Sequence, residues 1–194
     1  MLPTNLVLGS TSVYRAALLR RLLPEFTTAR PEVDETPLRG EAPLALAVRL
    51  AREKCLAVSA QFPADVVIGA DQVADRNGEC VGKAGNRANA IIDLQKSSGQ
   101  RLLFHSAVCV QNRGELHEFV DTTICHFRVL NLTEIAAYLD ADQPFDCAGS
   151  IKTESLGISL LTRMQSNDPT GVIGLPLIEL SRVLRLLSVS NAAS

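Results

Sequence analysis

An aspartate directly after an apolar run is the clearest candidate for chemistry in this chain. The run Val66–Ile68 is β-branched, and Gly69 and Ala70 separate it from Asp71. Such a run indicates a buried strand, and the small residues after it predict that the strand stops at Asp71. Ligands of open α/β sheets bind beyond the strand ends, so this carboxylate is well placed to act on one. The alternative is an aspartate that caps a turn.

The start of the first predicted helix is a second candidate. We expect a strand over Leu6–Gly9 and a helix from Tyr14 to Leu23, with Ser12 as its N-cap. Arg15 then lies in the first turn, where the helix dipole disfavours a cation unless an anion is nearby. A phosphate bound by the free amides of that turn would remove the conflict. The alternative is that Arg15 extends into solvent.

Three acids lie close together between Pro31 and Pro37, namely Glu32, Asp34 and Glu35. The flanking prolines disfavour a helix and stiffen the loop. Carboxylates held near one another attract a cation, so the loop is a candidate site for Mg²⁺ or Mn²⁺. A solvated acidic loop without a ligand is the alternative.

Two lysines could supply positive charge. Lys54 lies on the apolar side of a helix predicted from Pro43 to Ala60, where it either projects its ammonium into a site or extends along the surface to solvent. Lys83 follows a predicted hairpin turn at residues 75–78, which would return it towards Asp71.

The remaining elements indicate a mixed α/β protein. The patterns predict a strand at Phe26–Ala29, a helix at Asn86–Lys96, a long hairpin of Arg101–Gln111 with Glu115–Arg128, a capped helix from Asn131 to Leu139, a strand at Ile158–Met164 and a helix at Pro176–Leu187.

Composition excludes several classes of protein. The 194 residues are 46% hydrophobic, with a net charge of -2 and a pI near 5.9, which argues against binding a nucleic acid polymer. The five cysteines form no C-x-x-C pair and are expected to be reduced, buried thiols, and the three histidines lack metal-ligand spacing. Without a basic leader, a cleavage site or an apolar segment of membrane-spanning length, we expect a cytoplasmic protein with no membrane partner.

Several short motifs follow one another across nearly the whole chain. They are Ser12-x-x-Arg15, Glu32-Val33-Asp34-Glu35, Glu53-Lys54, Gly69-Ala70-Asp71-Gln72, Gly82-Lys83 and a late Gly-Leu-Pro. In this order they resemble the Maf family of nucleotide pyrophosphatases, most closely the branch that hydrolyses 7-methyl-GTP. The resemblance implies an elongated mixed sheet flanked by helices, of the Maf and ITPase type, in one domain over residues 1–194 with two lobes, a cleft and no linker. It also implies a homodimer and metal-dependent cleavage of a nucleoside triphosphate to a monophosphate and pyrophosphate, with Mg²⁺ or Mn²⁺ as cofactor.

The resemblance also implies roles for individual residues. Asp71 matches the catalytic acid and, with Glu35, a metal ligand. The residues that match the substrate-binding positions are Ser12, Arg15, Glu32, Glu35, Lys54 and Lys83. The positions that distinguish the branches are Tyr14, Gln72 and Glu154. Departures from the family pattern are Val13 and Ala84, where proline is usual, and Tyr14, where this branch typically has tryptophan.

Base recognition follows from these residue types. A carboxylate such as Glu154 can accept both donors on one edge of guanine. An aromatic face such as that of Tyr14 attracts the positive charge that N7-methylation adds, although less strongly than tryptophan does. Gln72 would add a hydrogen bond that orients the base.

Other functions remain open at this point. The same chemistry could act on dTTP or UTP, or the chain could be a nucleotide-binding regulator of cell division that has lost catalysis. A generic α/β protein with an acidic loop would bind no nucleotide at all. Pyrophosphate release from a panel of nucleotides separates these possibilities.

Overall fold

The computed structural model describes residues 5–192, with side chains described through Leu187. The strands are β1 (Leu6–Gly9), β2 (Thr27–Ala29), β3 (Val66–Arg76), β4 (Glu79–Val81), β5 (Arg101–Asn112), β6 (Glu115–Phe127) and β7 (Leu161–Gln165). The α-helices are α1 (Val13–Leu19), α2 (Pro43–Ser59), α3 (Arg87–Ser97), α4 (Leu132–Asp142) and α5 (Leu177–Ala192), and the 3-10 helices are η1 (Leu156–Leu160) and η2 (Gly171–Ile173). No helix in this part of the chain is both long and apolar enough to cross a bilayer.

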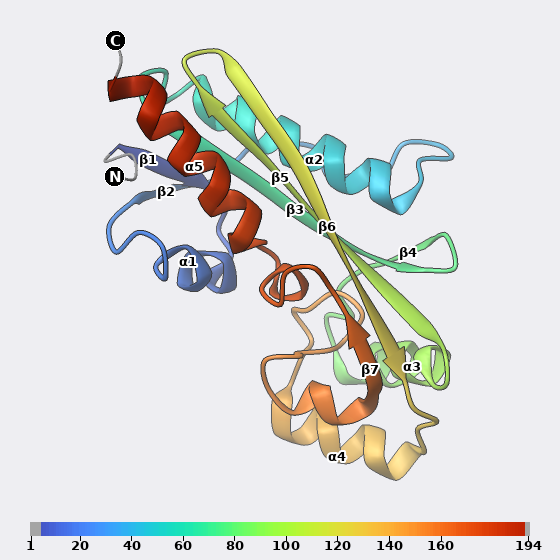
Figure 1. Cartoon of the computed structure of the whole chain (residues 1–194). Helices are drawn as coiled ribbons and strands as arrows, with labels where there is room; N and C mark the ends of the chain where they lie inside the picture. Colours follow the sequence, from blue (N-terminus) through green and yellow to red (C-terminus); the bar gives the residue numbers. More distant parts are fainter. Residues whose placement is uncertain (1–4, 193–194) are drawn as a thin grey trace.

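The strands form one mixed sheet of seven, which confirms the predicted α/β class. Its order is β2-β1-β3-β5-β6-β7, with β4 paired to β3 outside this path. β1 is parallel to β2 and β3, whereas the pairs β3–β5, β5–β6 and β6–β7 are antiparallel. The long strands β3, β5 and β6 cross the whole molecule and carry both of its halves (Figure 1).

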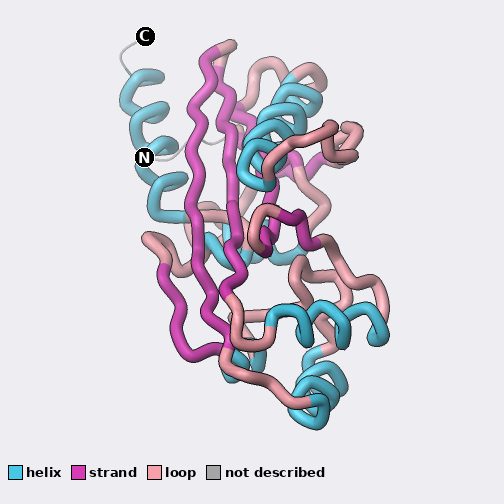
Figure 2. The backbone as a smooth tube through the Cα atoms, turned by 90° about the vertical axis from the view of Figure 1, so that its right-hand side faces the viewer, coloured by secondary structure: helices cyan, strands magenta, loops and turns pink. Residues whose placement is uncertain are grey.

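Alternation along β1 and β3 divides the first half of the molecule into two layers. Leu6 and Leu8, together with Val66, Ile68 and Ala70, pack against α1 and α5. Val7 and Val67 face the opposite way, towards α2. Figures 1 and 2 show the sheet between these helices. The two-residue period of a strand therefore sends Asp71 and Val73 to the α2 side and Gln72 to the other.

A second hydrophobic core fills the far half of the molecule. Phe104, Cys125 and Phe127 on the sheet pack there against Leu94 of α3 and Leu139 of α4. The helix α4 begins with the predicted capping box, in which Asn131 Oδ1 accepts from the Glu134 amide and Glu134 Oε2 accepts from the Asn131 amide. This core forms a second lobe opposite α1 and α5.

Gly69 allows α2 to lie unusually close to the sheet. A Cβ atom at this position would overlap the carbonyl oxygen of Ala51 and the amide nitrogen of Cys55. Lys54 lies between Ala51 and Cys55 on α2. The close approach of α2 to the sheet therefore brings the Lys54 side chain onto the face that carries Asp71.

The prediction that the third strand stops at Asp71 is wrong. β3 continues to Arg76 because β5 pairs with it along the way, from Val67 opposite Gln111 to Asp75 opposite Leu103. The strand predicted at Ile158–Met164 begins only at Leu161, since the residues before it form η1. The helix predicted to reach Leu23 ends at Leu19.

The cysteines are all free, as expected, but they are not all buried. Cys55, Cys109 and Cys125 lie in the interior, whereas Cys80 on β4 is exposed and Cys147 is half-buried. The expectation of five buried thiols is therefore wrong for two of them.

Candidate active site

A cleft of about 1540 Å³ opens beside the middle of β3. On that edge of β3, β1 pairs with residues 66–69 and β4 pairs with residues 74–76. Residues 70–73 between them have no strand neighbour on this edge in the part of the chain that the structure describes. Asp71 thus lies at a lateral gap in the sheet rather than at a strand end, and side chains from both faces of β3 reach the cleft.

The cleft brings together every residue that the sequence singled out. Its lining includes Ser12, Tyr14, Arg15, Glu32, Glu35, Lys54, Asp71, Gln72, Lys83 and Glu154. These residues come from α1, the loop before α2, α2 itself, β3, the segment after β4 and the segment before η1.

Lys54 connects two carboxylates at the floor of the cleft. Its Nζ lies 2.6 Å from Asp71 Oδ1 and 2.6 Å from Glu35 Oε1. The side chains of Lys54 and Asp71 are only 7% and 10% exposed, whereas that of Glu35 is 62% exposed. Because a buried charge requires a partner, the ammonium and the carboxylate of this pair stabilise each other away from water.

Arg15 lies at the start of α1, as predicted. Ser12 caps the helix by accepting from the Arg15 amide, and the Arg15 guanidinium donates from Nε to Gly174 O at 3.0 Å and from Nη1 to Ser10 Oγ at 3.3 Å. Burial lowers the pKa of Arg15, while the charges of Asp71 and Glu35 act in the opposite direction. An arginine keeps its proton under any such shift, so a fixed positive charge faces the cleft.

Gln72 ties β3 to η2. Its Nε2 lies 2.9 Å from Ser106 Oγ, 3.1 Å from Gly171 O and 2.8 Å from Val172 O. Ser106 Oγ in turn donates to Gly171 O at 2.6 Å. The contact of Gln72 with a base stays a prediction; the structure uses its amide nitrogen to hold η2, whose Val172 and Ile173 line the cleft.

Tyr14 reaches across to the second lobe. Its hydroxyl donates to Asp146 Oδ2 at 3.3 Å, and burial together with the nearby Cys147 and Asp146 raises its pKa. Glu154 is an exposed residue of the cleft wall, and Lys83 is exposed beside its backbone bridge to Ala148. The cleft therefore has an aromatic ring beside the carboxylate of Asp146, and Glu154 adds a further carboxylate to its lining.

The residue types of Asp71 and Glu35 are ones that could hold a magnesium or manganese ion. Both offer hard oxygen donors, and they already meet at one cation, the Lys54 ammonium. Among the described residues, no three His, Cys, Asp or Glu side chains gather as a metal cage. Mg²⁺ commonly binds through one or two carboxylates with phosphate oxygens and waters completing its shell, which needs no such cage.

Some residues of the site had no signal in the sequence. Ser10 and Gly174 hold Arg15, and Asp146 holds Tyr14. Ser10 and Asp146 belong to none of the motifs, and the late Gly-Leu-Pro that begins at Gly174 gave no indication of a contact with Arg15. Gly174 and Asp146 are remote from α1 along the chain, so only the fold brings them to it.

Comparison with known proteins gives a consistent result. The family described as "Maf-like protein" matches residues 5–187. The 7-methyl-GTP pyrophosphatase of Xanthomonas oryzae pv. oryzae (strain KACC10331 / KXO85) is 53% identical over 186 residues, covering 95% of this chain and 96% of that protein. The protein of the same name from Bordetella pertussis is 49% identical over 183 residues, covering 94% of this chain and 92% of its own length.

Solved structures with a similar arrangement are more distant. The Ham1 protein of Staphylococcus aureus gives a TM-score of 0.44 at 15% identity, covering 64% of this chain and 72% of that one. A HAM1 protein from Coxiella burnetii gives a TM-score of 0.44 at 16% identity, with coverages of 66% and 73%.

Proposed function

This chain belongs to the Maf family, and on that premise we propose that it hydrolyses 7-methyl-GTP to 7-methyl-GMP and pyrophosphate. The observation that carries the proposal is the contact of Lys54 with both Asp71 and Glu35 in a cleft that also exposes Arg15 and Lys83. Relatives with about 50% sequence identity over most of the chain are named 7-methyl-GTP pyrophosphatase.

The cations of the cleft suit a triphosphate. Arg15 presents a guanidinium whose position is fixed by Gly174 O and Ser10 Oγ, and the exposed Lys83 adds an ammonium to the cleft. Such groups offset the negative charge that builds on a departing pyrophosphate. Held in place before the reaction, Arg15 needs little reorganisation to do so.

We assign to Asp71 the activation of the attacking water molecule. Its carboxylate accepts a proton from a water molecule whose oxygen forms a bond to the α-phosphorus, while the bond from that phosphorus to the bridging oxygen breaks and pyrophosphate leaves. Lys54 holds Oδ1 of this carboxylate in a fixed position, and the proton later passes to solvent. Positioning of this kind is a large part of catalysis at phosphorus.

Asp71 and Glu35 would hold the divalent cation that we propose as cofactor. When bound, Mg²⁺ or Mn²⁺ supplies charge neutralisation at the phosphate oxygens.

The second lobe would hold the base: Glu154 accepts from the guanine edge, and the Tyr14 ring, oriented by Asp146, lies against the cationic purine. We also retain the homodimer as a proposal.

A substrate panel tests this function. Pyrophosphate release is measured with Mg²⁺ or Mn²⁺ from 7-methyl-GTP, GTP, dTTP and UTP under one set of conditions. The proposal predicts the highest kcat/KM for 7-methyl-GTP. Preference for dTTP or UTP would move the chain to another branch of the family, and nucleotide binding without any pyrophosphate release would indicate a regulator without catalysis.

A further inference from the structure

The loop between β2 and α2 carries Glu35 into the active site without any helix or strand of its own. Residues 30–42 have no regular hydrogen-bonded structure, and most of them are exposed. A segment of this kind stays in one position only where side chains fix it. The position of the Glu35 carboxylate therefore depends on its own ion pair with Lys54 and on the side chains that hold the rest of the loop.

Arg49 of α2 makes most of these contacts. It forms a two-pronged ion pair with Glu41, with Nε to Oε1 at 2.7 Å and Nη2 to Oε2 at 2.9 Å. Nη2 also donates to the backbone oxygen of Thr36 at 3.1 Å, and Nη1 donates to Glu53 Oε2 at 3.0 Å. Thr36 is the residue directly after Glu35, so Arg49 holds the backbone next to it.

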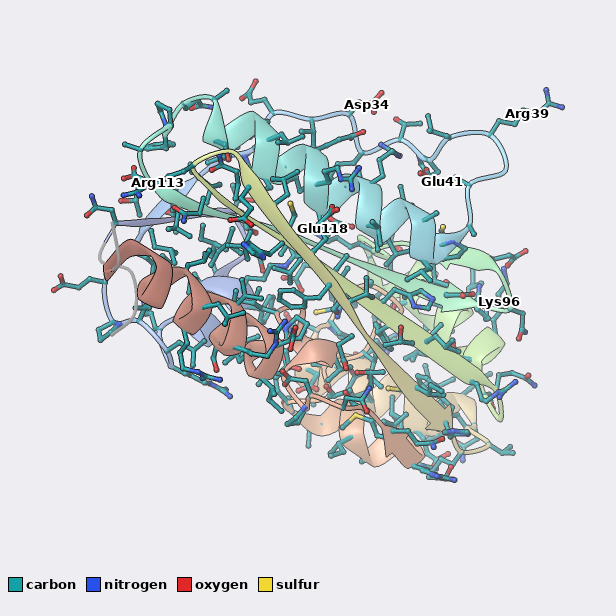
Figure 3. The ribbon with its side chains drawn as sticks, turned by 45° about the horizontal axis from the view of Figure 1, so that its top comes forward. Asp34, Arg39, Glu41, Lys96, Arg113 and Glu118 are labelled. Atoms are coloured by element: carbon teal, nitrogen blue, oxygen red, sulfur yellow. The ribbon has the colours of Figure 1, made fainter. Side chains whose placement is uncertain are left out.

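Glu41 provides the loop side of this set of contacts. We call the Arg49–Glu41 pair, together with the bond from Arg49 to Thr36 O, the clasp of the acidic loop. Glu41 Oε2 accepts from the Leu38 amide at 2.9 Å, and the two side chains of the pair are only 20% (Arg49) and 9% (Glu41) exposed. Figure 3 shows Glu41 between the loop and α2, with Arg39 extending away into solvent. Two-pronged arginine–carboxylate pairs fix geometry more tightly than a single lysine contact can.

We propose that Arg49 is a positioning residue, which through Glu41 and Thr36 O holds the acidic loop so that Glu35 reaches Lys54 in the active site. Arg49 itself does not line the cleft, and it touches none of the groups assigned to substrate. The proposal rests on the proposed function for its kinetic test but not for its structural one.

The same helix offers a matched control. Arg52 pairs with Glu118 of β6 through Nε at 2.7 Å and through a second contact from Nη2. Glu118 lies over the sheet, on the opposite side of α2 from the acidic loop (Figure 3). Arg49→Ala and Arg52→Ala therefore each remove one two-pronged pair from α2, but only the first releases the loop.

Hydrogen exchange tests the hold directly, without any substrate. The amides that are hydrogen-bonded within the loop, those of Thr36, Leu38 and Glu41, should exchange at least about 10-fold faster in Arg49→Ala than in the wild type. In Arg52→Ala they should exchange at the wild-type rate. Equal exchange rates in all three proteins would overturn the proposal. This result does not depend on which substrate the enzyme hydrolyses.

Kinetics then test the route through Glu35. With 7-methyl-GTP, Arg49→Ala should lower kcat by roughly 10- to 100-fold, as displacement of a positioned group does, while Arg52→Ala stays within about twofold of the wild type. Arg49→Lys keeps the charge but loses the two-pronged contact with Glu41, so its kcat should lie between those of Arg49→Ala and the wild type. When Glu35→Gln is already present, adding Arg49→Ala should lower kcat by less than about threefold further.

Two results would contradict this route. One is that Arg49→Ala retains the wild-type kcat. The other is that the losses of Glu35→Gln and Arg49→Ala multiply in the double variant, since independent sites behave in that way. A wild type that releases no pyrophosphate would instead defeat the proposed function, and the exchange measurement would still decide whether Arg49 holds the loop.

Discussion

The pair of Lys54 and Asp71 is the unusual feature of this molecule at the scale of single residues. Both side chains are almost fully buried, and Lys54 also contacts the more exposed carboxylate of Glu35 at the same distance of 2.6 Å. Removing one partner of a buried pair leaves the other without compensation, which is costly for stability. Proteins keep such pairs away from packed cores unless they have a function, and this one lies at the floor of the cleft that holds the candidate site.

Our proposal assigns Glu154 to the base, so its neutralisation should change selectivity rather than chemistry. Glu154→Gln keeps the shape but replaces a charge-assisted acceptor, and we expect kcat/KM for 7-methyl-GTP to fall by about 10-fold or more while the low rate with UTP changes little. Glu115→Gln, at the remote end of β6, is the control. An unchanged ranking of substrates would remove Glu154 from base recognition.

At the scale of elements, the sequence predicted most helices and strands from their periodicity and caps. It placed Ser12, Asn131 and the turn at residues 75–78 correctly, because caps and turns are local. It failed where pairing at long range decides. Nothing near Asp71 signals that β5 will extend β3 past it, or that Lys54 will lie opposite to make its burial acceptable.

The candidate site was predictable only in part for the same reason. The cluster of charged residues around a phosphate came from the order of its motifs and their resemblance to a family. The partners that hold them, such as Gly174 for Arg15 and Arg49 for the acidic loop, depend on tertiary contacts. No short-range pattern contains that information.

The close contact of α2 with β3 predicts a stability effect at Gly69. Gly69→Ala would place a methyl group against backbone atoms of Ala51 and Cys55, which cannot move aside as a flexible side chain can. We expect a loss of roughly 1–3 kcal/mol in the free energy of unfolding, measured by urea denaturation. Gly82→Ala meets no atom within 4 Å and should stay within about 0.5 kcal/mol of the wild type. Equal effects of the two substitutions would contradict this packing.

The clasp of the acidic loop should depend on pH. The Arg49 guanidinium lowers the pKa of Glu41 from its ordinary value of 4.5 to about 2. A carboxyl group with a lowered pKa in the folded state stabilises that state above pH 4.5 and loses this contribution as the pH falls towards 2.

A comparison of Glu41→Gln with the wild type measures this contribution. The variant should have the lower thermal unfolding midpoint at pH 7, and the difference should shrink progressively between pH 4.5 and pH 2. A difference that stays constant over this range would show that the charge of Glu41 does not stabilise the loop.

At the scale of the whole molecule, two hydrophobic cores share one sheet. The first lies among α1, α5, the start of β3 and the later part of β5, and the second among α3, α4, the start of β5 and the end of β6. Because β3, β5 and β6 run through both, neither lobe has a sheet of its own (Figure 2).

This shared sheet predicts that the two lobes unfold together. Leu180→Ala in the first core and Leu94→Ala in the second each remove a fully buried side chain, and each should cost about 2–5 kcal/mol. Circular dichroism should show one transition in both variants, shifted to lower denaturant concentration. Two separate transitions, with each variant shifting only one of them, would show that the lobes are independent.

The central claim is that Asp71 takes the proton of the attacking water in a pyrophosphatase that accepts 7-methyl-GTP. The most direct test compares pyrophosphate release from 7-methyl-GTP by the wild type and by Asp71→Asn, with circular dichroism and nucleotide binding measured on both proteins. We expect the variant to fold and bind nucleotide but to lose at least about 100-fold in kcat, as enzymes do without their general base. An Asp71→Asn protein with a kcat close to that of the wild type would contradict the claim.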